Sequence, residues 1–372
     1  MVKERAGILG NGKRETKTGK RRRWLIAIGI SFGLIFGWHF GLDFFREEEK
    51  GLRRQIREAV ERKFPDQAAK EAGTYGLHQF RSNLAIPLPN KQFYPTVVLI
   101  HGLDEPGKVW MNLAPALAAE GFNVWEMSYP NDQPIAMSAR LFFDELGGFK
   151  ELGTNRISIV AHSMGGLVSR EMLTNPDLLY IEKAGTGEVP EVVDLIMVGT
   201  PNHGSELARF SVFTEFRDQW INATEGKGHW LKWILDGAGE AKIDLLPDSK
   251  FLTRLNSRPQ PVGVKMSVIA GVASPWHEDD INEFVESIHD EVSENEHQML
   301  GELKKFLKSV SDSLGDGIVT VSTSRLDGVP HRIVRGTHLS MIRNVSEKSE
   351  RIPPAVTLII EQLKQSPIHQ RN

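Results

Sequence analysis

From about residue 75 onward, short runs of apolar residues alternate with segments in which apolar residues recur every three or four positions. The short runs are almost continuously apolar, which is typical of parallel strands buried on both faces. Six such runs occur, at residues 96–101, 122–129, 156–161, 192–199, 264–271 and 331–335. They predict the strands of one mostly parallel sheet.

Segments between several of these strands have the periodicity of amphipathic helices. They cover residues 109–121, 136–149 and 166–173, and residues 353–364 supply a closing helix that opens with Pro353 and Pro354. Strands that alternate with helices imply a sheet with helices on both faces, joined by right-handed crossovers. The predicted fold class is therefore α/β.

Two long inserts interrupt this alternation, at about 205–262 and about 274–314. Both follow predicted strands, so we expect them to form helical caps over the carboxyl edge of the sheet, where ligands bind in open α/β folds. The first insert contains Trp220, Trp230 and Trp233. These side chains fit either an apolar lid or anchors of the core.

The longest uncharged apolar run lies near the N-terminus, at residues 24–42. As a helix it is long enough to cross most of the hydrocarbon core of a bilayer. The basic cluster at residues 20–23 would keep the preceding head, residues 1–23, in the cytoplasm and place the rest of the chain outside. A cleaved signal peptide is the alternative, but the run is long for one and no Ala-x-Ala site follows it. A buried soluble helix fits the flanking charges less well.

Four glycines recur at every fourth position of this run, at Gly29, Gly33, Gly37 and Gly41. They share one helical face where a second helix could approach, which favours self-association or a membrane partner, although glycine is common in membrane helices. Residues 43–74 then form a charged segment, in which Leu52, Ile56, Val60 and Phe64 make a narrow apolar stripe. We expect a solvated helical stalk there, with a helix on the membrane surface as the alternative.

Charge is divided unevenly along the 372 residues. Residues 1–23 carry nine Lys or Arg against two acidic residues, a balance of +7, and the remaining 36 basic and 46 acidic residues leave −10. A basic head on an acidic body argues against nucleic acid as the main partner. Cysteine is absent, which excludes disulfides and thiolate metal sites. No Gly-rich phosphate loop and no zinc signature occur, so the sequence predicts no cofactor and no metal.

The sequence SIVAHSMGGLVSR, residues 158–170, runs from a predicted strand into a predicted helix through Ser163. A serine hydroxyl is a poor nucleophile unless its position and a neighbouring base activate it. A sharp strand-to-helix turn exposes the side chain and tolerates only small residues two positions before and after it, here Ala161 and Gly165. The N–H of Met164 then lies at a helix N-terminus, where it can stabilise an oxyanion.

These residues resemble the nucleophile elbow of the α/β-hydrolase superfamily, within the lipases and esterases that carry A-H-S-M-G, such as triacylglycerol lipases and GPI inositol-deacylase-like hydrolases. The resemblance spans roughly residues 92–365 by order of elements, and Ala161 replaces the usual first glycine. It implies an α/β-hydrolase fold, here preceded by one transmembrane helix, and a second oxyanion donor after the first parallel strand. Leu103 is our choice for that donor, and His101 has a structural role because it lies too early for the base.

The same resemblance places an acid and then a histidine after the serine. Asp316 and Gly317 lie on a loop that enters a short apolar strand, where lipases of this type carry Asp-Gly-x-Val, although Asp-Gly also marks plain turns. Three histidines follow. One, His331, begins a strand and another, His369, lies in a polar tail, whereas His338 follows the end of a strand, so His338 is the predicted base.

Residues 198–208 resemble the stretch that these lipases carry after the next strand. Pro201 and Gly204 would shape the pocket wall, and His203 fits a loop-stabilising hydrogen bond better than a ligand role.

The sequence therefore predicts a membrane-anchored serine hydrolase that acts on lipid or other acyl esters through Ser163, His338 and Asp316. Two alternatives stay open: a non-catalytic interaction protein on the same fold, and an acyltransferase or thioesterase with the same triad. The predicted organisation is a basic head at 1–23, an anchor at 24–42, a stalk at 43–74 and a hydrolase domain at 75–372. The catalytic domain would face the periplasm in a bacterium or a lumen in a eukaryote.

Overall fold

The computed structural model describes five stretches of the chain and a few isolated helical positions in the second insert. The stretches are residues 50–81, 95–103, 107–205, 239–273 and 315–366 without residue 347, and the isolated positions are 282, 285, 286, 301, 304 and 305. Two compact units divide the chain, Met1–Leu52 and Arg53–Asn372. The predicted basic head and anchor, the glycine stripe of the anchor, the tryptophans of the first insert and His369 lie outside the described residues.

The unit from Arg53 onward is built on a seven-stranded sheet with the strand order β1-β3-β2-β4-β5-β6-β7. All six predicted strands are present and mutually parallel. They are β2 (Thr96–Ile100), β3 (Asn123–Ser128), β4 (Arg156–His162), β5 (Glu191–Val198), β6 (Lys265–Val272) and β7 (His331–Arg335). The central strands β2, β4 and β5 are almost wholly buried, as their continuous apolar runs predicted.

One strand was not predicted. The edge strand β1 (Gly76–Gln79) pairs antiparallel with β3 and has only four residues, which show no apolar run. A short edge strand buries little side-chain surface, so its sequence carries a weak signal.

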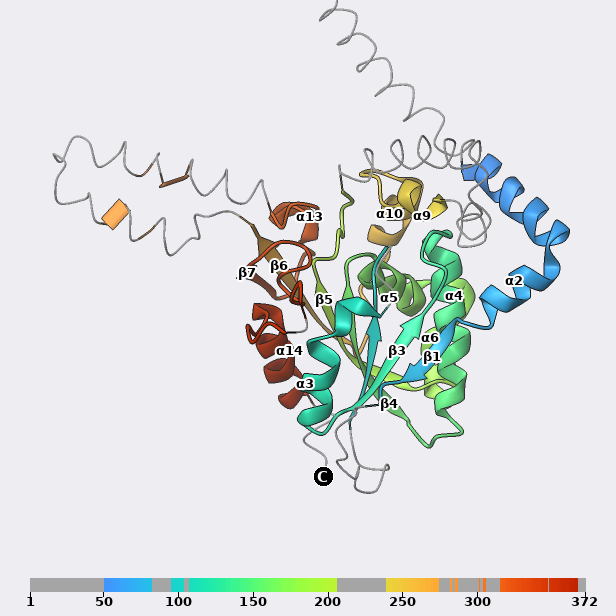
Figure 1. Cartoon of the computed structure of the whole chain (residues 1–372), viewed down its shortest axis with the longest axis horizontal. Coiled ribbons are helices and arrows are strands. Elements are labelled where there is room, and N and C mark those ends of the chain that lie inside the picture. The colour runs from blue at the N-terminus through green and yellow to red at the C-terminus, as the bar shows by residue number, and fades with distance from the viewer. Residues whose placement is uncertain are drawn as a thin grey trace, which may run out of the picture. The chain divides into compact units, whose positions relative to one another are not determined.

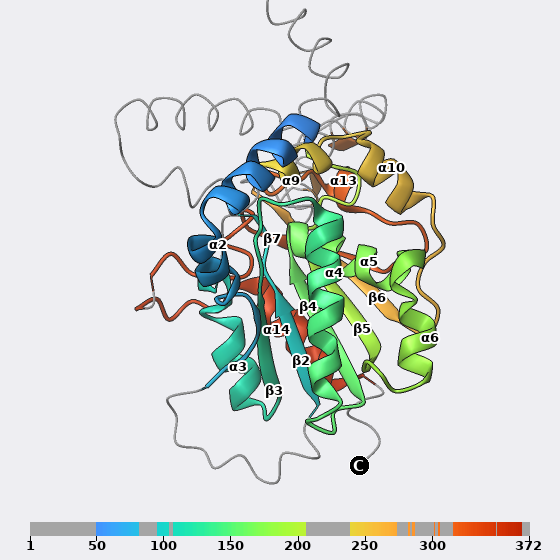
Figure 2. The ribbon, with the colours of Figure 1, turned by 90° about the vertical axis from the view of Figure 1, so that its right-hand side faces the viewer.

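Helices cover both faces of the sheet, as the alternating pattern predicted (Figure 1). On one face lie α3 (Leu113–Ala119) and α14 (Pro354–Lys364), which pack on a buried cluster that includes Leu99 and Ile359. On the other face, which is turned toward the viewer in Figure 2, lie α4 (Ile135–Leu146), α5 (Met164–Thr174) and α6 (Tyr180–Gly185). Short 3-10 turns accompany them at Lys108–Trp110, Gly147–Phe149 and Pro176–Leu178.

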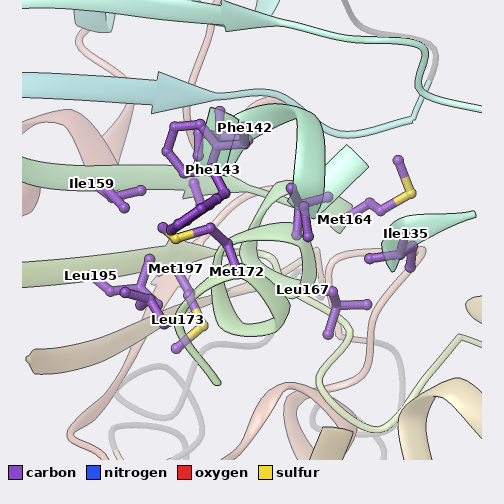
Figure 3. Packing of buried hydrophobic residues seen from close by; sticks show 14 of the residues in the cluster. Ile135, Phe142, Phe143, Ile159, Met164, Leu167, Met172, Leu173, Leu195 and Met197 are labelled. Atoms are coloured by element: carbon purple, nitrogen blue, oxygen red, sulfur yellow. The ribbon is translucent and has the colours of Figure 1, made fainter. Parts of the chain in front are cut away.

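The core on the second face fixes α5 against the middle of the sheet. Figure 3 shows Phe142 and Phe143 of α4 near Met172 of α5, with Ile159 of β4 and Leu195 of β5 beneath them. Burial of each such side chain contributes about 1.5–3 kcal/mol. The N-terminus of α5 is thereby held at the carboxyl end of β4.

The described end of the first insert, from residue 239, is helical and packs into this core. It contains α9 (Glu240–Asp244) and α10 (Lys250–Asn256), whose Ala241, Phe251 and Leu252 are buried. The Asp244 carboxylate accepts a hydrogen bond from the Ile135 N–H at 3.0 Å and so caps α4.

The segment after Asp316 differs from the predicted apolar strand. It forms a short helix, α13 (Val321–Ser324), because the Thr320 hydroxyl accepts a hydrogen bond from the Thr323 N–H at 3.1 Å and caps the turn. Ser and Thr side chains that bind nearby backbone compete in this way with strand pairing.

Residues 53–63 are also helical, and α2 (Pro65–Ala72) follows them. Arg57 of this segment is buried and its Nε donates to Glu240 Oε1 at 3.1 Å, whereas Ile56 of the apolar stripe is 42% exposed. Across the described ranges, no helix has both the length and the hydropathy that crossing a bilayer requires.

Candidate active site

Ser163 lies between β4 and α5 in a strained backbone conformation. Its φ is 54° and its ψ is −128°, a region that non-glycine residues rarely adopt and that costs about 1–3 kcal/mol. The Ser163 N–H donates to the Val198 carbonyl at 2.8 Å, which ties the turn to the end of β5. This is the sharp strand-to-helix turn that the sequence predicted around Ser163.

The residues around Ser163 are small because the neighbouring backbone and side chains leave no room for larger ones. A Cβ on Gly165 would lie 2.3 Å from the Ile100 carbonyl oxygen, so only glycine lets α5 approach β2 this closely. A Cβ on Gly102 would lie 2.6 Å from the Ser163 Cβ. Ala161 is fully buried in β4, where the register places it beside Ile100 of β2.

His338 and Asp316 form a buried pair at the carboxyl edge of the sheet. His338 Nδ1 lies 2.7 Å from Asp316 Oδ2, and the two residues are 5% and 2% exposed. Asp316 Oδ1 accepts from the N–H groups of Ile318 and Val319 at 2.8 Å and 2.7 Å. Because the carboxylate accepts the proton on Nδ1, the unprotonated Nε2 of His338 remains able to act as a base.

Two contacts connect His338 to the strand that carries Ser163. His162 Nε2 donates to the His338 carbonyl at 3.0 Å, and the two imidazole rings are 4.7 Å apart between centroids. Gly199, which follows the Val198 that holds Ser163, would place a Cβ 3.1 Å from the His338 ring. The structure thus places the pair of His338 and Asp316 at the ends of β6 and β7, with the His338 ring beside His162, the residue that precedes Ser163.

The two predicted oxyanion donors lie beside Ser163. Met164 is buried as the first residue of α5, whose 11 residues direct N–H groups and a positive helix-dipole end toward the turn. Leu103 follows Gly102 after β2 and is half-buried. The arrangement as a whole can bind a carbonyl carbon next to a hydroxyl and a carbonyl oxygen next to backbone N–H groups.

Comparison with protein families decides the relationship. The sequence model of the alpha/beta hydrolase family matches residues 97–321, which is more than half of the chain. The chain belongs to the alpha/beta hydrolase family. The predicted resemblance is thereby confirmed for this hydrolase, although none of the curated proteins matches its sequence.

Several solved structures are similar to the hydrolase. A mature lipase of Bacillus licheniformis shares 17% identity with a TM-score of 0.47, over 78% of this chain and 98% of the lipase. A metagenomic carboxyl esterase shares 16% identity with a TM-score of 0.46, over 77% and 82% of the two chains. A phospholipase from Legionella pneumophila shares 16% identity with a TM-score of 0.46, over 73% of this chain and 59% of its own.

The loop after β5 borders the site of the hydrolase. Gly204 has a φ of 91°, and a Cβ there would lie 2.7 Å from Pro247, so the loop packs closely on the connection between α9 and α10. Pro201 is buried, whereas His203 is exposed, with its Nδ1 3.4 Å from the Asn256 amide nitrogen. The loop-stabilising role of His203 stays a prediction.

Arg170 of α5 anchors this loop, a role that the sequence pattern did not indicate. Its Nη1 donates to Asn202 Oδ1 at 3.0 Å and its Nη2 to Asn256 Oδ1 at 2.9 Å. Burial lowers the pKa of Arg170 to about 10, so the guanidinium is still charged at neutral pH. The loop, α5 and α10 are therefore joined by charge-assisted hydrogen bonds.

Proposed function

We propose that the hydrolase cleaves carboxylic esters by nucleophilic catalysis, with Ser163 as nucleophile, His338 as general base and acid, and Asp316 as the acid that orients His338. The observation that carries this proposal is the 2.7 Å contact between His338 Nδ1 and Asp316 Oδ2. The His338 ring lies 4.7 Å from that of His162, which directly precedes Ser163 on its strained turn at a helix N-terminus.

The steps follow from the chemistry of these groups. Ser163 Oγ attacks the ester carbonyl carbon while His338 Nε2 takes the hydroxyl proton, and the carbonyl oxygen becomes an oxyanion that the N–H groups of Met164 and Leu103 stabilise. The intermediate collapses, the alcohol leaves with the proton from His338, and an acyl enzyme remains. Water, deprotonated by His338, then releases the carboxylic acid and restores Ser163.

We further propose that residues 24–42 anchor the hydrolase in a membrane with residues 1–23 on the cytoplasmic side, and that the substrates are lipid or other acyl esters. The uncharged run and its basic flank support the anchor. The glycine stripe of that run supports self-association. Fractionation tests the anchor: the full chain is expected to stay in the pellet after an alkaline wash, and recovery in the supernatant would contradict it.

A substrate panel tests the activity. The full-length chain is assayed on aryl esters from acetyl to palmitoyl, on phospholipids and on an acyl thioester, together with Ser163→Ala and the control Ser257→Ala on the exposed end of α10. Ester hydrolysis is expected in the wild type and the control, with a loss of about 10⁴-fold or more in Ser163→Ala. Equal activity in Ser163→Ala would contradict the proposal, and transfer of the acyl group to an added alcohol in place of water would assign an acyltransferase.

A further inference from the structure

His101 is a buried histidine that the proposed reaction does not use. It follows β2 directly, is 1% exposed, and precedes Gly102, whose backbone lies against the side chain of Ser163. A buried imidazole beside a nucleophile needs a physical reason, because burial of a polar ring is costly unless the ring is hydrogen-bonded.

The ring binds the peptide group that carries the proposed oxyanion donor. His101 Nδ1 lies 2.8 Å from the Gly102 carbonyl oxygen. A carbonyl oxygen only accepts, so Nδ1 carries the proton and donates it. The Gly102 carbonyl and the Leu103 N–H belong to one planar peptide group, and no described peptide bond is cis. The two groups therefore point in opposite directions, and the hydrogen bond that holds the carbonyl also sets the direction of the Leu103 N–H.

Tyr129 holds His101 in turn. The two rings are stacked with centroids 4.5 Å apart and planes inclined by 11°. Tyr129 Oη donates to the His101 carbonyl at 2.6 Å, and Tyr129 is 2% exposed. The carbonyl groups on both sides of the Gly102 Cα are thus fixed. Tyr129 holds the carbonyl of His101, and the His101 ring holds the carbonyl of Gly102.

The same segment is in contact with the helix that carries the other donor. A Cβ on Gly165 would lie 2.6 Å from the His101 carbonyl oxygen, so α5 packs directly on this part of the backbone. Met164, the other proposed donor, is the residue before Gly165. The positions of the Leu103 N–H and the Met164 N–H consequently depend on the same packing of α5 against the backbone after β2.

We propose that His101 is a positioning residue, which aims the Leu103 N–H at the oxyanion through its hydrogen bond to the Gly102 carbonyl. This inference rests on the proposed ester hydrolysis. If the peptide group between Gly102 and Leu103 were free to rotate, the Leu103 N–H would stabilise the oxyanion less. Complete removal of one oxyanion-hole donor costs about 10²–10³-fold in kcat. We expect a loss smaller than this when the Nδ1 donor is removed.

The test compares an aryl ester with its thionoester, in which sulfur replaces the carbonyl oxygen. Sulfur accepts hydrogen bonds weakly, so the ratio of kcat between the two substrates measures how much the oxyanion hole contributes. The full-length wild type is compared with His101→Leu, which has no donor, with His101→Asn, whose amide can replace Nδ1, and with Tyr129→Phe, which keeps the ring and removes the hydroxyl. Thermal unfolding of each variant checks the fold.

In His101→Leu we expect kcat on the oxygen ester to fall by about 10-fold to 100-fold, KM to change by less than about twofold, and the oxygen-to-sulfur ratio to shrink. In His101→Asn the oxygen-to-sulfur ratio of kcat should stay close to the wild-type value. In Tyr129→Phe the ratio should shrink by a few fold, as it does in His101→Leu. The proposal would be overturned if folded His101→Leu kept the wild-type oxygen-to-sulfur ratio of kcat, including the case in which kcat falls equally on both substrates.

If His101→Leu does not fold, Tyr129→Phe provides the test, and an unchanged oxygen-to-sulfur ratio of kcat in that variant would overturn the inference. Failure of the proposed function is seen separately, because the wild type would then show no hydrolysis that depends on Ser163, and this inference would fall with it.

Discussion

Asp316→Asn is the substitution whose effect the structure specifies most fully. Asp316 Oδ1 accepts from two backbone N–H groups, of Ile318 and Val319, while Oδ2 faces His338 Nδ1. An amide in this place would keep its oxygen on the two N–H groups, because it has only one acceptor. Its NH₂ group would then face Nδ1 and donate to it, so the proton of His338 would move to Nε2. A histidine in that tautomer cannot accept the proton of Ser163.

The expected loss is large in rate and small in stability. A base held in the wrong tautomer costs about 10⁴-fold in kcat, which corresponds to about 5 kcal/mol of transition-state stabilisation. All three hydrogen bonds of the side chain persist, so the fold should be retained. Asp316→Ala is a poor substitute, because the buried Val319 N–H would lose its acceptor at a cost of about 1–3 kcal/mol in folding free energy.

The assay is steady-state hydrolysis of a soluble aryl ester by the full-length wild type, Asp316→Asn and Ser163→Ala, with thermal unfolding recorded for each. KM should change little, since the carboxylate does not contact substrate. An Asp316→Asn activity within tenfold of the wild type, while Ser163→Ala is inactive, would refute the assignment of Asp316.

The remaining predictions concern stability. Gly165→Ala forces a Cβ to within 2.3 Å of a β2 carbonyl oxygen and should lower the free energy of unfolding by about 3 kcal/mol or prevent folding, and a wild-type urea midpoint would contradict this. Arg57→Ala removes a partner of the fully buried Glu240 and should lower the free energy of unfolding by about 3 kcal/mol. The control Arg62→Ala removes an exposed ion pair and should lower it by less than about 1 kcal/mol. Equal urea midpoints for the two variants would refute the role of the pair of Arg57 and Glu240. Burial lowers the pKa of His331 from 6.5 to about 4, so between these values the unfolded chain binds more protons and stability falls as pH falls. His331→Gln should weaken this dependence in urea unfolding at pH 7 and pH 5, and an unchanged dependence would count against it.

Much of the fold follows from local patterns in the sequence. Buried parallel strands need nearly continuous apolar runs, so all six were predicted within a residue or two at each end. The turn at Ser163 depends on residues within two positions of it, which makes its motif readable without any knowledge of distant contacts.

Features that depend on distant residues or on weak local signals were missed. β1 is too short to show a pattern, and the segment after Asp316 looks apolar enough for a strand although a threonine cap turns it into α13. The pair of Arg57 and Glu240 joins residues 183 positions apart, and no periodicity in either segment indicates it. The hydrogen bond from His162 to His338 spans 176 positions, but a signal existed, because His162 lies inside the motif that identified Ser163.

The central claim is that one serine is made reactive by His338 and Asp316. Mass spectrometry of the full-length chain after exposure to a fluorophosphonate measures this reactivity directly. The account predicts a single adduct on the peptide that contains Ser163, formed fast in the wild type, slowed by orders of magnitude in Asp316→Asn and absent in Ser163→Ala. An adduct on another residue, or labelling of Ser163 at the same rate in Asp316→Asn, would contradict it.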